Sequence, residues 1–145
     1  VGITTDRADF PFMQMIGLSS YPYFAYPTPE DMPADYYTRV VAGAPGLPAM
    51  VVEGGWPSAG ASANGQTFVS SPALQARYIS RHAALLDSIG ALGWLQLEFA
   101  DIDVGSLPPP LPANLPLFVT LGLVDSQYLA KPALAQWDAL FARPR

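Results

Sequence analysis

The chain alternates short apolar runs with helical segments, and this order constrains the fold more than any other feature of the sequence. The apolar runs at 13–20, 49–55 and 93–101 are typical of strands. The segments 29–43, 71–90 and 132–142 have the spacing or the boundary residues of helices. Strands that alternate with helices predict parallel strands with right-handed crossovers, as in a doubly wound sheet or a barrel. We therefore predict an α/β fold.

Local signals set the expected boundaries of these elements. Ser71 is a typical N-cap, Pro72 fits a first helical turn, and Gly90 ends the apolar spacing of three and four that follows them. The run at 93–101 has the period of two of a strand, and the run at 49–55 is continuously apolar, as in a strand buried on both faces. The polar, Gly-rich stretch 56–69 and the Pro-rich stretch 102–116 are expected to be loops.

Composition excludes several classes of function. Only 13% of the residues are charged, which indicates elements covered on both sides or a surface that further protein should cover. The net charge of -5 provides no basic stripe, so nucleic acid is not an expected partner. Without Cys, and with His82 as the single histidine, thiolate and His-rich metal sites are excluded. No apolar run is long enough to span a bilayer, and no Gly-rich phosphate loop is present, so we expect neither a membrane partner nor a cofactor.

Carboxylates and aromatic side chains follow the predicted strands. Ligands of parallel α/β folds bind beyond the carboxyl ends of the strands, and there the chain has Tyr21, Glu53, Trp56, Glu98 and Asp101. Such a set suits sugars, whose ring faces stack on aromatic rings while their hydroxyls bind carboxylates. Glu53 closes an apolar run and has no evident structural task, so a catalytic role and a simple capping role are both open.

Two motifs resemble a known family of enzymes. VVEGGWPSAGASANG at 51–65 resembles the segment around the catalytic nucleophile of plant-type β-1,3-glucanases, and SSYPYFAYP at 19–27 is similar to the sixth-strand segment of those enzymes and of endo-β-1,4-galactanases. The resemblance implies a clan A glycoside hydrolase. It further implies that residues 1–145 form one partial domain, the C-terminal three βα units (strands 6 to 8) of a TIM-type (β/α)8 barrel, which is incomplete as a single chain.

The resemblance also implies a mechanism. Glu53 would be the nucleophile of a retaining enzyme acting on a β-linked polysaccharide such as β-glucan or galactan, with Tyr21, Tyr23 and Trp56 shaping the sugar site. Retaining enzymes need a second carboxylate as acid and base. The family places it after an Asn at the end of the fourth strand, and this sequence has no Asn-Glu pair. Glu98 either replaces it or lines the sugar site.

Three further residues and the expected partners complete the prediction. We expect Gln96 to line the site, and Asp101 either to bind substrate hydroxyls or to serve a turn or cap. His82 is expected to be a packed, hydrogen-bonded residue. The alternative to an enzyme is a non-catalytic carbohydrate-binding or assembly fragment. Expected partners are an oligo- or polysaccharide and either a second copy of the chain or a missing N-terminal barrel part. Only the resemblance points to an extracellular or periplasmic location.

Overall fold

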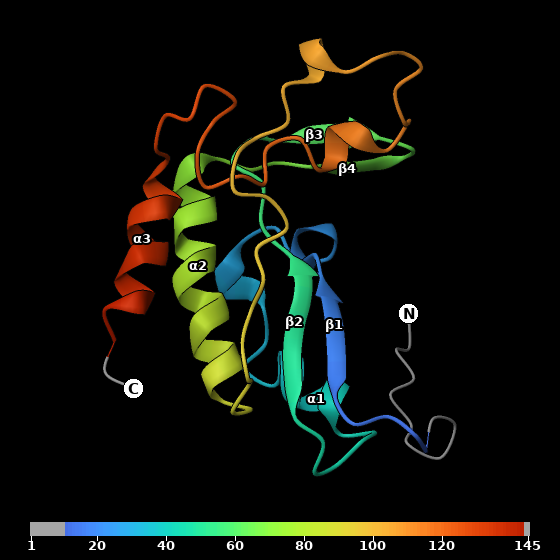
Figure 1. The fold of residues 1–145 in the computed structure, drawn as a ribbon, viewed down its shortest axis with the longest axis vertical. Coiled ribbons are helices and arrows are strands. Elements are labelled where there is room, and N and C mark those ends of the chain that lie inside the picture. The colour runs from blue at the N-terminus through green and yellow to red at the C-terminus, as the bar shows by residue number, and fades with distance from the viewer. Residues whose placement is uncertain (1–10, 144–145) are drawn as a thin grey trace.

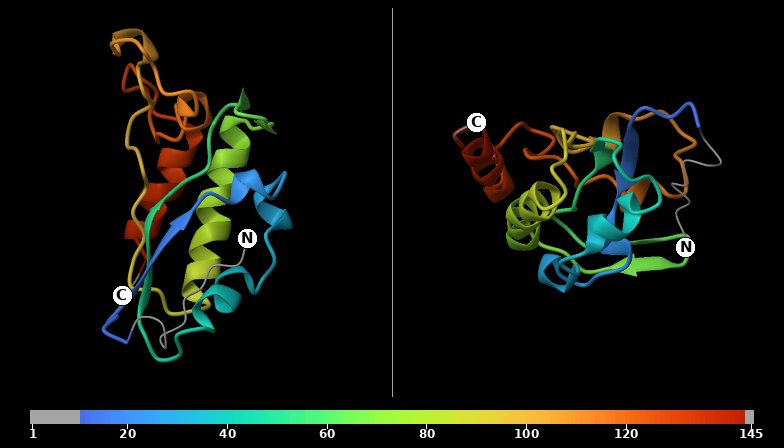
Figure 2. Two further views of the ribbon diagram at one scale, coloured as in Figure 1. Left: turned by 90° about the vertical axis from the view of Figure 1, so that its right-hand side faces the viewer. Right: turned by 90° about the horizontal axis from the view of Figure 1, so that it is seen from below.

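The computed structural model describes residues 11–143 and shows a small α/β arrangement in which the strands carry helices on one side (Figures 1 and 2). The larger elements are β1 (Ile16–Ser20), α1 (Tyr36–Val41), β2 (Ala49–Gly54), β3 (Ala61–Ala63), β4 (Gln66–Phe68), α2 (Pro72–Asp87) and α3 (Pro132–Phe141). Short 3-10 turns occupy Pro22–Phe24, Pro29–Asp31, Val104–Ser106 and Leu115–Leu117. Within the described residues, no helix is long and apolar enough to cross a membrane.

The strands β1 and β2 are parallel, as the sequence predicts, and a bulge interrupts their register. Leu18 pairs with Val51, but the next residue of β1, Ser19, pairs with Glu53, so Val52 is an extra residue in β2. Bulges re-aim the side chains that follow them. The bulge therefore places Glu53, and not Val52, opposite Ser19.

The predicted third strand runs parallel to β2 but is not a regular strand. Backbone bonds join Leu95 N to the Val51 carbonyl at 2.9 Å and Leu97 N to the Gly54 carbonyl at 2.8 Å. Two residues along this segment thus span three along β2, because the bulge at Val52 adds a residue there. With β2 this segment therefore forms a single isolated bridge, between Val51 and Trp94. The predicted parallel direction of the segment 93–101 is confirmed, but the prediction of a regular strand there is wrong.

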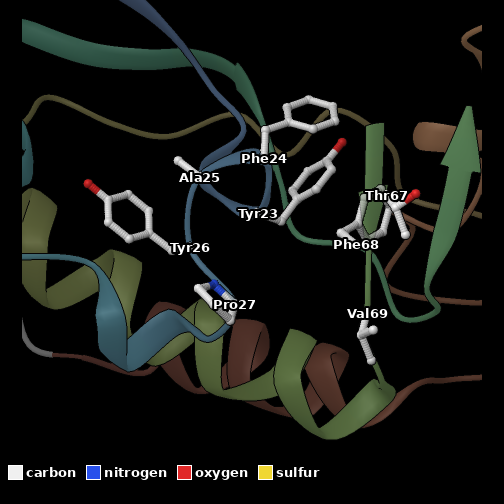
Figure 3. Close-up of a pocket in the computed structure, with 8 residues that line it drawn as sticks. All are labelled: Tyr23, Phe24, Ala25, Tyr26, Pro27, Thr67, Phe68 and Val69. Atoms are coloured by element: carbon white, nitrogen blue, oxygen red, sulfur yellow. The ribbon is translucent and has the colours of Figure 1, made fainter. Parts of the chain in front are cut away.

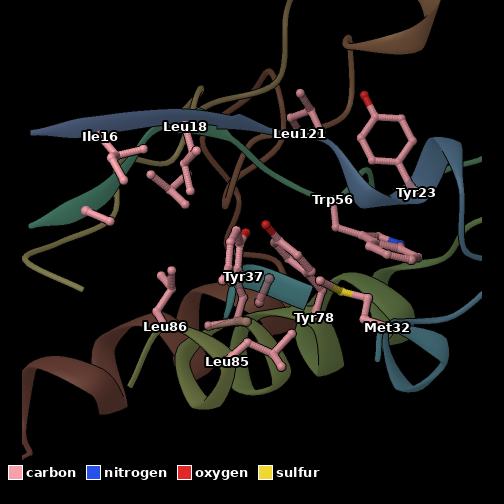
Figure 4. Packing of buried hydrophobic residues seen from close by; sticks show 14 of the residues in the cluster. Ile16, Leu18, Tyr23, Met32, Tyr37, Trp56, Tyr78, Leu85, Leu86 and Leu121 are labelled. Atoms are coloured by element: carbon pink, nitrogen blue, oxygen red, sulfur yellow. The ribbon is translucent and has the colours of Figure 1, made fainter. Parts of the chain in front are cut away.

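The core lies between the strands and α2 (Figure 4). Ile16 and Leu18 point from β1 toward Tyr37, Tyr78, Leu85 and Leu86, and all of these side chains are buried. The helix begins as predicted, since the Ser71 hydroxyl accepts a hydrogen bond from Leu74 N at 3.2 Å. The figures place α3 beside α2 on the same side of the strands. Within residues 11–143, these helices cover one face of the β1–β2 pair, and side chains such as Val52 are exposed on the other.

Three other predictions require correction. The helix expected over 29–43 is reduced to Tyr36–Val41, because Pro33 holds Met32 in an extended conformation (φ -63°, ψ 121°) that ends the preceding turn. The expected loop at 56–69 contains the hairpin β3–β4, which turns at Asn64 and Gly65, both with positive φ. The strand β2 is not buried on both faces, because Val52 is 40% exposed.

Candidate active site

The carboxyl ends of β1 and β2 bring Tyr21 and Glu53 together. Tyr21 directly follows β1, Glu53 is the next-to-last residue of β2, and the Tyr21 hydroxyl donates a hydrogen bond to Glu53 Oε1. Both side chains are half-buried. The two motifs identified in the sequence therefore meet at one point, although Tyr21 and Glu53 lie 32 residues apart along the chain.

An aromatic cluster surrounds Tyr21. Its ring lies 6.2 Å from that of Phe24 and 5.3 Å, edge to face, from that of Phe118. Burial, the hydrogen bond to Glu53 and the charge of that carboxylate raise the pKa of Tyr21 far above its ordinary value of 10. The phenol therefore stays protonated at any physiological pH and acts as a permanent hydrogen-bond donor to Glu53.

Close contact between the strands requires glycine directly after Glu53. A Cβ atom on Gly54 would lie 2.3 Å from the Ser20 carbonyl oxygen, which is a backbone atom and cannot rotate away. The small residue thus lets β1 and β2 approach at the point where Tyr21 reaches Glu53.

The predicted sugar-stacking roles of Trp56 and Tyr23 do not fit their burial. Trp56 is 1% exposed, packs against Tyr78 at 5.5 Å, and donates its indole N–H to Ser70 Oγ at 3.0 Å. Tyr23 is 4% exposed and donates its hydroxyl to the Leu117 carbonyl at 3.0 Å. Both rings support the site from the core, because Trp56 enters the core directly after Gly55 and Tyr23 is the buried middle residue of the 3-10 turn Pro22–Phe24. Phe24, which is 39% exposed, is the accessible ring of that motif.

Glu98 and Gln96 extend the candidate site along the third segment. The Gln96 side-chain amide donates a hydrogen bond to the Leu121 carbonyl at 2.7 Å. One of its two N–H donors is therefore used within the protein and is not free for a ligand. Burial and then the negative charge of Asp101 raise the pKa of Glu98 to about 7, against the opposing effect of Lys131. A carboxyl with this pKa is partly protonated at neutral pH. The neighbouring charge that raises it belongs to Asp101.

Asp101 has a structural role, but not the local turn or cap that the sequence suggested, because its partners lie 21 and 30 residues further along the chain. Its Oδ1 atom accepts hydrogen bonds from Gly122 N at 3.0 Å and from Lys131 Nζ at 2.5 Å, and the two charged side chains are only 13% and 10% exposed. Lys131 also donates to Ser58 Oγ at 2.9 Å and to the Gly122 carbonyl at 2.9 Å. This cluster fastens the start of α3 to the loops beyond the strands. Nothing in the pattern around Lys131 predicts it.

His82 and the acidic residues offer no metal site within residues 11–143. No group of three or more His, Asp or Glu side chains is arranged there to hold a metal ion. His82 is fully buried, its Nε2 atom lies 2.7 Å from the Tyr37 hydroxyl, and burial lowers its pKa to about 3. The prediction of a packed, hydrogen-bonded histidine is confirmed.

Comparison with solved structures shows glycoside hydrolase folds as neighbours of this chain. The β-1,3-glucanosyltransferase of glycoside hydrolase family 17 from Rhizomucor miehei has a TM-score of 0.58 and 23% identity over 83% of this chain. The β-glucuronidase from Ruminococcus gnavus has a TM-score of 0.63 and 18% identity over 94% of the chain, and that from Bifidobacterium dentium has 0.65 and 17% over 92%. No protein-family model and no curated protein matched.

These likenesses establish the fold. The chain is a small α/β unit whose neighbours are TIM-barrel glycosidases, in agreement with the family resemblance of the two sequence motifs. It spans 42% of the length of the glucanosyltransferase and about a fifth to a quarter of the glucuronidases (21% and 24%). One structure of the glucanosyltransferase, an active-site mutant, holds laminaritriose.

Proposed function

We propose that this chain supplies the nucleophile side of a retaining glycoside hydrolase or transglycosidase site, in which Glu53 attacks a β-linked sugar. The observation that carries the proposal is the hydrogen bond from Tyr21 to Glu53 at the carboxyl ends of two parallel strands. Active sites of (β/α)8 barrels lie at this end of the strands. The motif around Glu53 and the likeness to glycosidase folds support the same assignment.

In this proposal β1, β2 and the segment 93–100 correspond to the sixth, seventh and eighth strands of the barrel. Support comes from their order, since β2 bonds to β1 on one side and to the segment on the other, all in parallel. Each is followed along the chain by a helix. The two sequence motifs then fall on the sixth and seventh strands, as the resemblance implies.

The chemistry follows from a carboxylate nucleophile. A Glu53 oxygen forms a bond to the anomeric carbon while the glycosidic C–O bond breaks, and the leaving oxygen takes a proton from an acid. Water or a sugar hydroxyl then attacks the anomeric carbon, releases Glu53 and gives its proton to the same group, now acting as base. Tyr21 holds the attacking carboxylate in one orientation. Retention requires the acid/base carboxylate about 5 to 5.5 Å away.

The remaining strands of a barrel are the proposed source of that second carboxylate. Apolar side chains of the neighbouring segment are exposed, with 54% for Leu95, 39% for Leu97 and 61% for Phe99, and Val52 of β2 is 40% exposed. An exposed apolar patch with open strand edges favours packing against further protein. We propose that further βα units cover this surface. A chain that forms a finite dimer in solution would instead indicate that a second copy covers it.

A trapping experiment tests the nucleophile without its acid partner. The probe is a 2,4-dinitrophenyl 2-deoxy-2-fluoro-β-glycoside, in gluco and galacto forms. Its dinitrophenolate group leaves without protonation, and the fluoroglycosyl group forms a slowly hydrolysed ester with the nucleophile. The expected result is one fluoroglycosyl group on the peptide that contains Glu53, detected by mass spectrometry. Labelling should vanish in Glu53→Gln and persist in the matched variant Glu30→Gln, whose exposed side chain pairs with Arg77. Absence of an adduct on the folded chain, or one that survives Glu53→Gln, would overturn the proposal.

A further inference from the structure

A groove beside the candidate nucleophile has a lining that suits a sugar ring. It has a volume of about 300 Å³ and lies between residues 23–27, which follow β1, and residues 67–69 at the end of the hairpin (Figure 3). This volume is at the low end of the range for small-molecule sites, which suits one ring.

The lining carries aromatic and aliphatic groups and no charge. Phe24, Tyr26 and Phe68 contribute partly exposed rings, with the buried Tyr23 behind them, while Thr67 adds a hydroxyl. The absence of a cation there matters in a chain with a net charge of -5, because a buried anionic ligand without a counter-charge is strongly disfavoured. Aromatic faces with a few hydroxyls match a neutral sugar, which presents C–H groups on its faces and hydroxyls at its rim.

Phe24 is the lining residue of the groove that also contacts Tyr21. The Phe24 ring lines the groove, lies 6.2 Å from the Tyr21 ring, and Tyr21 donates its hydrogen bond to Glu53. On its other side Phe24 lies 6.3 Å from Phe68. A glycan with one ring at Glu53 could therefore stack a second ring on Phe24 and Phe68.

We infer that this groove is a binding subsite for a neutral sugar ring of the glycan, remote from the bond that Glu53 attacks. The inference rests on the proposed function for the orientation of the chain, while the groove can be tested independently of catalysis. The groove should therefore bind neutral β-linked oligosaccharides more tightly than oligosaccharides that contain glucuronate. Longer oligosaccharides, which reach both positions, should bind more tightly than single sugars.

The test is an amide NMR titration of the ¹⁵N-labelled chain with neutral β-glucan and β-galactan hexasaccharides and with a glucuronate oligosaccharide. A neutral hexasaccharide should shift the amides of Ala25, Thr67 and Val69. Val69, 81% exposed, is a suitable site for a charge, and Val69→Asp should weaken hexasaccharide binding by about fivefold or more, because it replaces an aliphatic group of the lining with a hydrated carboxylate that loses water when the C–H face of a sugar packs on it. Leu92→Ala, at an exposed site outside the groove lining, is the control and should bind as the wild type.

The outcomes separate this inference from the proposed function. Trapping of Glu53 by the monosaccharide probe should be unchanged in Val69→Asp, because that probe does not reach the groove. Groove shifts without any labelling of Glu53 would retain the subsite and reject the nucleophile. Labelling of Glu53 with no shift at Ala25, Thr67 or Val69 by any neutral oligosaccharide would overturn the subsite. Tighter binding of the glucuronate ligand than of neutral ones would also overturn it.

Discussion

His82 should make the stability of this chain sensitive to acid. The ring is fully buried, stacks at 5.4 Å on Tyr37 and lies 4.2 Å from the Trp94 ring. Burial lowers its pKa from 6.5 to about 3. The folded chain therefore keeps a neutral imidazole, whereas the unfolded chain takes up a proton once the pH falls below about 6.5.

The sign and size of the effect follow from this difference. A depressed pKa in the folded state means that stability is present above pH 6.5 and is lost as the pH falls toward 3. Each pKa unit corresponds to about 1.4 kcal/mol of free energy. Between pH 7 and pH 4.5, protonation of His82 in the unfolded state should remove roughly 2–3 kcal/mol from the free energy of unfolding.

The variant His82→Phe isolates this contribution. Phenylalanine keeps a ring beside Trp94 and does not titrate, and the Tyr37 hydroxyl keeps its second partner, Ser20 Oγ, at 2.6 Å. Urea unfolding at pH 7 should show a loss of about 1 kcal/mol for the missing hydrogen bond. At pH 4.5 the variant should equal or exceed the wild type in stability. Equal losses of stability in both proteins between the two pH values would refute the reasoning.

Three further predictions concern stability and the site. As the pH rises from about 4.5 to about 7, Glu98→Gln should gain stability relative to the wild type, because the raised pKa of Glu98 makes its charged form unfavourable in the folded chain. The gain should be roughly 1–2 kcal/mol, since solvent screens a partly exposed carboxylate. Urea unfolding at pH 4 and pH 8 checks this. Ser71→Ala should cost about 1 kcal/mol of unfolding free energy through loss of the α2 cap. Gly54→Ala should cost about 1–3 kcal/mol or more by forcing β1 from β2; in Gly93→Ala, where the nearest atom is 4.0 Å from the new Cβ, thermal unfolding should show far less change.

Local signals in the sequence predicted much of the fold. The cap at Ser71 and the apolar spacing behind it fixed α2, because both depend on residues within a few positions of each other. The apolar runs at 13–20 and 49–55 predicted β1 and β2 for the same reason. The Asn64–Gly65 turn is also a local signal, and it predicts the hairpin β3–β4 that the reading of 56–69 as a loop overlooked.

The candidate site was predictable only in part. Glu53 and Tyr21 stand in recognisable motifs, and parallel strands bring their carboxyl ends together, so their proximity follows from sequence and topology. The burial of Trp56 does not follow, because whether a ring faces the site or the core depends on how the chain turns after Gly55. The same holds for Asp101, whose partner Lys131 lies thirty residues further along the chain.

The sequence alone therefore determined the strands β1 and β2, the helix α2 and the expectation of parallel strands, while the identity of the candidate nucleophile came from the resemblance of its motif to a known family. Packing between distant segments determined the rest: the bulge at Val52 that re-aims Glu53, the loss of ladder pairing over 93–101, and the exposure of Phe24 in place of Trp56. These features arise where strands, loops and helices far apart in sequence compete for the same contacts. No local pattern records the outcome of that competition, because its free energy depends on which surfaces finally meet.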